Sequence, residues 1–175
     1  MTPWTGYSPR AMRGLRTVVA TLFVLLASGA LASSAEAQKR DAALGPHLGI
    51  NFDGDNVLVG GHGRFDVANV TPEVVLQIYP NLSYYFSRGD WDVFNLSCDV
   101  PFEFVINNSS LRPYAAPGLA LFWSTGPGND DIDLGLDLIG GLLFELGSVE
   151  PWFELRVIIS GGASAELRGG VQFVL

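Results

Sequence analysis

The sequence is short of cysteine, lysine and long apolar runs. Its one cysteine, Cys98, excludes an intramolecular disulfide and a cysteine-based metal site. Lysine occurs once, at Lys39, whereas the surfaces of soluble proteins usually carry several lysines. Beyond residue 37, no stretch offers the roughly 18 uninterrupted apolar residues that indicate a membrane-spanning helix. The formal net charge of −8, without a basic patch, argues against a nucleic-acid partner.

The first 37 residues are typical of a cleavable signal peptide. Three arginines precede an apolar segment at residues 18–31, and the small-residue pattern Ala-Glu-Ala ends at Ala37. The apolar segment is shorter than the roughly 20 residues of a spanning helix, which disfavours a membrane anchor. Met12 is an alternative start, because the chain from Met12 resembles a more ordinary signal peptide. We therefore expect export, with residues 38–175 as one mature domain.

Apolar and polar residues alternate through the mature chain. From residue 94 to 104, every even-numbered residue is apolar, and every odd-numbered residue is polar except Pro101. A period of two places the two sets on opposite faces of a β-strand. Apolar spacing at three and four residues is nowhere sustained, so no helix is expected. Eight such runs are separated by turns, at residues 44–52, 56–67, 73–86, 92–104, 111–123, 131–146, 149–160 and 163–175.

The length of these runs predicts an all-β, eight-stranded antiparallel up-and-down transmembrane barrel. Strands of soluble proteins average about 5–6 residues, whereas a tilted membrane-spanning strand needs about 9–11. Alternation alone does not say which face looks inward. The scarcity of lysine, the lack of helices and the apolar C-terminal residues favour an apolar face toward lipid. The alternative is a secreted lipocalin-like barrel that binds an apolar ligand inside.

With the apolar face toward lipid, the polar face would fill the lumen. We predict a lumen ion-pair network, because this face carries arginines and carboxylates together. An eight-stranded interior is just wide enough for side chains to fill it, so we expect a plugged lumen. The alternative is a narrow pore, which the excess of acid would make cation-preferring. The predicted network comprises Arg64, Asp99, Glu103, Arg112, Asp137, Glu145, Glu154, Arg156, Glu166 and Arg168.

Aromatic residues near the predicted turns indicate interfacial girdles of the kind that flank the apolar band of membrane barrels. One girdle comprises Tyr84, Phe86, Trp91 and Trp123. Trp152 is predicted to lie in the opposite girdle, together with Phe153 and Phe104.

Three stretches resemble the small OmpA-like, opacity-protein-like outer-membrane β-barrels. Residues 111–121 (LRPYAAPGLAL) are similar to a Pro-Tyr-Val-Gly-Ala-Gly-Leu-Gly strand of that family, and residues 139–146 (IGGLLFEL) to the glycine-rich strand that follows it. Residues 168–175 resemble the C-terminal assembly signal, carried here by Val171, Phe173 and Leu175. The resemblance implies insertion by the barrel assembly machinery of a Gram-negative-type cell, with both termini in the periplasm.

The resemblance also bears on function and partners. It implies a monomeric barrel in contact with outer-membrane lipids, with a structural or interfacial role. Some outer-membrane barrels deacylate lipid A with a His-Ser dyad on the lipid side, but the His-x-Ser-Asn pattern is missing here. We therefore expect no enzymatic activity and no cofactor.

The two histidines, His47 and His62, have the parity of the lumen and fall on neighbouring predicted strands. As metal ligands they would need a third partner, such as Asp66. We interpret them as hydrogen-bonding residues of the lumen and expect no metal.

Overall fold

The computed structural model describes residues 42–87, 91–127 and 129–175, so the predicted signal peptide (1–37) and the alternative start at Met12 lie outside the described residues. Among the described residues, no helix is long and apolar enough to cross a membrane. The strands form one antiparallel sheet. They are β1 Ala43–Asn51, β2 Asn56–Thr71, β3 Val74–Phe86, β4 Asp92–Asp99, β5 Phe102–Phe104, β6 Leu111–Gly126, β7 Asn129–Phe144, β8 Val149–Ile159 and β9 Ala163–Val174.

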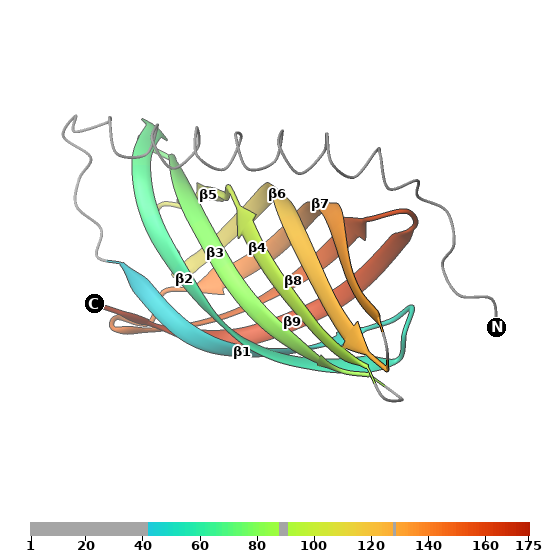
Figure 1. Cartoon of the computed structure of the whole chain (residues 1–175). Helices are drawn as coiled ribbons and strands as arrows, with labels where there is room; N and C mark the ends of the chain where they lie inside the picture. Colours follow the sequence, from blue (N-terminus) through green and yellow to red (C-terminus); the bar gives the residue numbers. More distant parts are fainter. Residues whose placement is uncertain (1–41, 88–90, 128) are drawn as a thin grey trace. The chain divides into compact units, whose positions relative to one another are not determined.

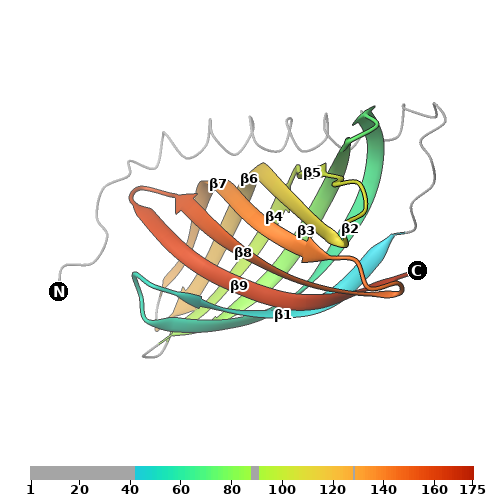
Figure 2. The same ribbon diagram turned by 180° about the vertical axis from the view of Figure 1, so that it is seen from behind.

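The sheet closes into a barrel, as Figures 1 and 2 show from opposite sides. Except for β4 and β5, which do not pair with each other, each strand pairs with its neighbours along the chain, and β1 pairs with both β2 and β9. The closing contact extends to Leu175, whose backbone N–H donates to the carbonyl oxygen of Ala42 at 2.8 Å. Closure removes the free strand edges, which a bilayer core does not tolerate.

The predicted run 92–104 forms two labelled strands that occupy one position in the barrel. Both β4 and β5 pair with β3 and with β6. They are separated at Val100 and Pro101, and proline has no N–H for the ladder. The ladder is kept in part, since Val100 donates to Pro117 and Pro101 accepts from Gln77, each at 2.9 Å. The prediction of an eight-stranded antiparallel barrel is therefore confirmed.

The apolar face of the barrel points outward and the charged face inward. Leu48 is 65% exposed and Leu155 is 50% exposed, whereas Glu154 and Arg156, which flank Leu155, are both fully buried. The same alternation runs along β3 and β4. This orientation contradicts the lipocalin-like alternative, which requires the apolar side chains inside.

Three hairpins differ from the predicted boundaries. β2 continues to Thr71, past the predicted end at residue 67, and pairs with β3 through two register shifts. β6 and β7 stay paired as far as Gly126 and Asn129, so the loop predicted at residues 124–130 is mostly strand. β7 ends at Phe144, before the predicted residue 146, and the following turn uses Gly147 at a φ of 83°. A positive φ of this size carries little steric cost for glycine, which has no Cβ.

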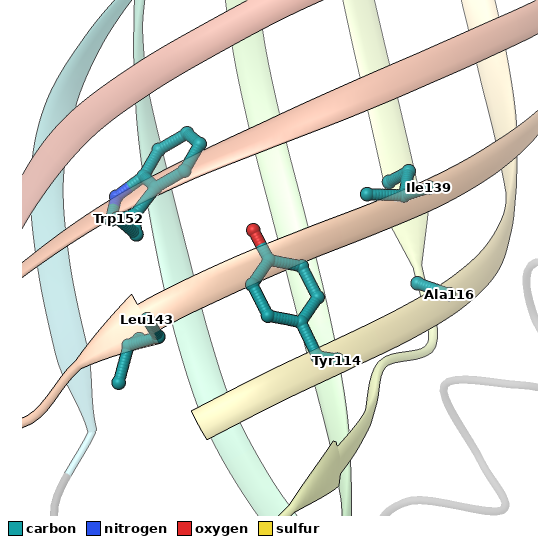
Figure 3. Close-up of a cluster of buried hydrophobic side chains, with 5 residues drawn as sticks. All are labelled: Tyr114, Ala116, Ile139, Leu143 and Trp152. Atoms are coloured by element: carbon teal, nitrogen blue, oxygen red, sulfur yellow. The ribbon is translucent and has the colours of Figure 1, made fainter. Parts of the chain in front are cut away.

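The placement of Trp152 in an interfacial girdle is wrong. Its side chain is 3% exposed and lies inside the barrel, in a buried cluster with Tyr114, Ala116, Ile139 and Leu143 (Figure 3). The reason is strand parity: Trp152 lies two residues before Glu154 on β8, so both side chains point inward. Phe153 and Phe104, predicted for the same girdle, point outward at 45% exposure each.

Candidate functional site

The middle of the lumen is occupied by a charge cluster around Arg156 of β8. Its Nη2 donates to Asp99 Oδ2 at 2.8 Å and to Glu154 Oε1 at 3.2 Å. Its Nη1 donates to Asp137 and, at 2.9 Å, to Ser97 Oγ. The side chains of the arginine and the three carboxylates are all fully buried in these ion pairs. One guanidinium therefore serves three carboxylates.

Strand register brings these side chains together from three strands, β4, β7 and β8. Asp99 of β4 pairs with Gly118 of β6, and Gly118 pairs with Asp137 of β7. The two aspartates therefore lie at the same level of the sheet, with Gly118 between them. Arg156 lies on β8, which neighbours β7. The sequence predicted all four charged residues for the lumen network, but it did not indicate their pairing.

A second cluster surrounds Arg168 of β9. Its Nε donates to Glu166 Oε2 at 2.8 Å, its Nη1 to Asn81 Oδ1 at 3.1 Å and its Nη2 to the Tyr85 hydroxyl at 3.0 Å. The Tyr85 hydroxyl in turn donates to Glu166 Oε1 at 2.7 Å. All of these groups are buried, which fixes the arginine in one position.

A third group lies toward the end of the barrel where β1 begins and β9 ends. Arg112 donates to Glu103 Oε1 at 2.9 Å and also pairs with Glu145. Arg64 Nη1 lies 3.8 Å from Glu103 Oε2. The guanidinium carbon of Arg64 lies 4.3 Å from the ring centroid of Tyr114. Arg112 and Glu145, with side chains 13% and 38% exposed, are the accessible members of the predicted network.

The two histidines lie in the lumen, with ring centroids 5.7 Å apart. His47 Nε2 is 2.9 Å from Ser83 Oγ, and His62 Nε2 is 3.3 Å from Gln172 Oε1. Asp66, the proposed third ligand, instead accepts a hydrogen bond from Gln77 at 2.7 Å. In the part of the chain that the structure describes, no group of three His, Cys, Asp or Glu residues could hold a metal ion.

Sequence reasoning missed the apolar part of the lumen. Leu58, Leu143 and Ile158 are buried at 0–2% exposure, with inward parity. Their inward strand parity is the signal that identifies them, whereas their apolar character alone points to the lipid face. The lumen thus contains an apolar and aromatic layer besides its ion pairs.

The other predicted girdle lies on the outer surface. The ring of Tyr84 contacts Phe86 edge to face at 5.0 Å between centroids, and Phe94 at 5.1 Å. Phe94 in turn lies 6.4 Å from Trp123. Phe86, Trp91 and Trp123 are 42–52% exposed. Of the predicted assembly signal, Phe173 and Leu175 are exposed at 50% and 65%, and Val171 is half-buried.

Solved structures of three barrels match this arrangement. The N-terminal β-barrel domain of Pseudomonas aeruginosa OprF aligns with 78% of this chain and 98% of its own, at 16% identity and a TM-score of 0.64. Neisserial surface protein A (NspA) aligns with 77% of this chain and 95% of its own, at 14% identity and a TM-score of 0.56. Ail, the attachment invasion locus protein of Yersinia pestis, aligns with 80% of this chain and all of its own, at 12% identity and a TM-score of 0.56.

This chain has the fold of the small outer-membrane β-barrels. At 12–16% identity, the likeness is one of fold. No protein-family model and no curated protein sequence matched the chain. The resemblance to OmpA-like barrels that the sequence suggested is confirmed at this level, and the barrel's individual role is inferred from its own residues.

Proposed function

We propose that this chain is an integral protein of the outer membrane with a structural or interfacial role, and that ion pairs close its lumen. The outward apolar face supports membrane insertion: leucine, isoleucine, valine and phenylalanine side chains are exposed around the barrel, in the pattern that contacts acyl chains. The aromatic surface cluster of Tyr84, Phe94 and Trp123 suits the boundary between headgroups and acyl chains.

The observation that carries the closed lumen is the burial of Arg156 with Asp99, Asp137 and Glu154. These groups extend from β4, β7 and β8, and all of their side chains are fully buried. An ion passing along the axis would have to displace a guanidinium that carries three carboxylate contacts. Breaking such buried pairs is strongly unfavourable.

Recording currents in planar lipid bilayers tests the closed lumen. The protein, purified from membranes in detergent, is expected to give no discrete current steps. A matched sample of the Arg156→Ser variant, checked for folding by heat-modifiable gel migration, shows whether the assay detects an opened lumen. Cation-selective steps from the unaltered protein would overturn the plug and favour the narrow pore.

Fractionation tests the location. We expect the protein in the outer-membrane fraction, with a gel migration that changes on heating because a closed barrel resists detergent unfolding. N-terminal mass spectrometry of the extracted protein is expected to begin at Gln38, after signal-peptide cleavage. A protein that remains monomeric in water without detergent would contradict membrane insertion.

An interfacial rather than an adhesive role is supported by the short turns at the end distant from the termini. With both termini in the periplasm, the outward turns would be those between β1 and β2, β3 and β4, β6 and β7, and β8 and β9. The first spans only residues 52–55, and the last only residues 160–162. They offer little surface for a protein ligand.

The same proposal includes the absence of lipid-modifying activity. His47 and His62 are 4% and 6% exposed and face the lumen, so neither imidazole reaches the lipid side. Mass spectrometry of lipid A from cells with and without the protein is expected to show identical species. Loss of an acyl chain that depends on the protein would overturn this part.

A further inference from the structure

A polar pocket of about 160 Å³ lies inside the barrel at the end where β1 begins and β9 ends. Acidic residues outnumber basic ones in its lining, which includes Asp66, Glu103, Glu145 and Glu150 but only one basic residue, Arg64. Part of the wall carries no polar side chain, at Ala43, Gly147 and Val174. A cavity of about 150 Å³ is enough to hold benzene, so this space suits a ligand of about six non-hydrogen atoms or fewer.

Glu150 is a buried carboxylate of this pocket that has no cation beside it. It is 6% exposed, and its Oε2 accepts a hydrogen bond from Gln172 Nε2 at 2.6 Å. Among the residues that the structure describes, Glu150 forms no salt bridge. The guanidinium group of Arg64 lies instead over the rings of Tyr79 and Tyr114, neither of which lines the pocket. A buried charge without a partner is unfavourable.

The second oxygen of Glu150 is open to the pocket. Oε1 has no hydrogen-bond partner among the described residues, and it is not one of the fully buried side-chain atoms that lack a partner. It therefore keeps accessible surface. Glu150 shares the inward parity of Trp152 on β8, and the space that it lines is the pocket. A ligand in the pocket can therefore reach this oxygen.

Strand register places a second carboxylate opposite Glu150. The register of the β7–β8 hairpin is fixed on both sides of this position, by the pairs Leu143–Trp152 and Leu146–Val149. Between them, Glu145 lies opposite Glu150, and both line the pocket. Directly opposite residues have Cβ atoms about 4.5–5.5 Å apart, and like charges there are destabilising. Arg112 pairs with Glu145 and not with Glu150, so a cation beside Glu150 would relieve the repulsion.

The chemistry of the lining favours an ammonium group over a metal ion. In the described part of the chain, no group of three His, Cys, Asp or Glu residues could hold a metal ion. An ammonium group carries one positive charge and three N–H donors, and it can bind through a single carboxylate oxygen. The uncharged wall at Ala43 and Val174 suits a short alkyl chain.

We propose that this pocket binds a primary alkylammonium group, which donates to Glu150 Oε1 and lies beside Glu145. Such binding goes beyond the structural role and does not depend on whether the lumen conducts. The group has two sources, a small free amine or a lysine of this chain. The mature chain has one lysine, Lys39, which lies outside the described residues and four positions before Ala43. The Lys39→Gln variant distinguishes the two sources.

NMR titration of the mature protein in detergent micelles tests binding directly. The probes are ethylammonium, tetramethylammonium and calcium chlorides, and the readouts are the ¹H–¹⁵N resonances of the Glu150 backbone and the Gln172 side-chain amide. Ethylammonium is expected to shift both saturably and to bind at least about tenfold more tightly than tetramethylammonium, which has the charge but no N–H donor. Equal or tighter binding of tetramethylammonium or calcium would overturn the ammonium assignment.

The same titration of Lys39→Gln identifies the source. Saturable binding to the unaltered protein supports a free amine as the ligand. Binding that appears only in Lys39→Gln supports the pocket and identifies Lys39 as the group that fills it. No saturable shift with ethylammonium in either protein would overturn the proposal.

Two variants and one control assign the contacts. Glu150→Gln keeps the shape but loses the charge, and Ala43→Val reduces the volume for the alkyl chain. Each is expected to weaken ethylammonium binding at least about tenfold. Glu73→Gln is the control, because it removes an exposed carboxylate in the turn between β2 and β3, outside the pocket lining. Folding is checked by heat-modifiable migration. Unchanged binding in folded Glu150→Gln, or an equal loss in Glu73→Gln, would contradict the assignment.

Discussion

The carboxylate of Asp99 lies in the space that a side chain at Gly118 would occupy. A Cβ added to Gly118 would lie 1.8 Å from Asp99 Oδ1 and 2.9 Å from the Cα of Asp99. The two residues are register partners on β4 and β6. The missing side chain thus lets Asp99 lean across β6 toward the guanidinium of Arg156, 2.8 Å away.

Gly118→Ala is therefore expected to destabilise the barrel by about 1–3 kcal/mol, the usual cost of forcing extra atoms into a packed interior. The clash involves backbone as well as side-chain atoms, so rotation of Asp99 alone does not relieve it. Urea unfolding in lipid vesicles, followed by tryptophan fluorescence, measures the change in free energy of unfolding. Gly140→Ala is the matched control, because a Cβ at Gly140 meets nothing within 4 Å. Equal effects of the two substitutions would contradict the packing described.

Removal of the central guanidinium should cost more. Arg156→Met leaves three buried carboxylates without their shared cation, and we expect a loss of about 3–5 kcal/mol in the free energy of unfolding. Glu145→Gln, which removes the exposed partner of Arg112, should cost about 1 kcal/mol or less. Adding Asp99→Asn and Asp137→Asn to Arg156→Met is expected to recover part of the loss. A further decrease in the triple variant would show that charge compensation is not the reason for the effect.

Quenching by brominated lipids should separate the tryptophans. In variants that retain a single mature tryptophan, Trp123 is expected to be quenched strongly because it is 52% exposed on the lipid face. Trp152 should resist quenching, since it is 3% exposed and its ring packs edge to face against His62 at 4.9 Å. Strong quenching of Trp152 would restore its placement in a girdle and contradict the interior cluster.

The closing pair of strands gives a further test. A Cβ at Gly45 would lie 1.9 Å from the backbone oxygen of Val171 across the β1–β9 contact, whereas one at Gly61 would only approach the oxygen of Gly45 at 3.8 Å. We expect Gly45→Ala to reduce the fraction of protein that reaches the heat-modifiable closed form in vesicles. Gly61→Ala should close as the unaltered protein does. Normal closure of the Gly45→Ala variant would contradict this expectation and mean that β1 and β9 can pair at a larger distance from each other.

Much of the barrel could be predicted from alternation, because a strand of period two determines which residues share a face. The parity of residues 94–104 placed Phe94 outward and Asp99 inward, as the structure has them. The same alternation fits a barrel with its apolar face inside and one with its apolar face outside. The scarcity of lysine and the length of the strands therefore had to indicate which face points inward. For Trp152 the two signals disagree: tryptophan is typical of membrane interfaces, whereas its strand parity with Glu154 points inward, and parity is the correct guide.

The pairing inside the lumen could not be predicted from the sequence. The neighbour of Arg156 on β9 is Glu166, yet the carboxylates closest to Arg156 come from β4 and β7. A long arginine side chain in a narrow barrel reaches across the axis, so adjacency along the wall does not select its partner. The loop predicted at residues 124–130 failed for a related reason: turn-forming residues such as Gly126 can also extend a ladder when the partner strand continues.

The seam between β1 and β9 joins residues more than a hundred positions apart in the chain, such as Leu48 and Gly169. Every other neighbouring pair of strands belongs to a local hairpin and can begin to form as soon as its own turn is made. Ring closure is therefore the slowest entropic step available to this topology, since it must wait for the longest loop. Until that moment the polypeptide is an open ribbon with two borders, and each border carries unpaired backbone N–H and C=O groups.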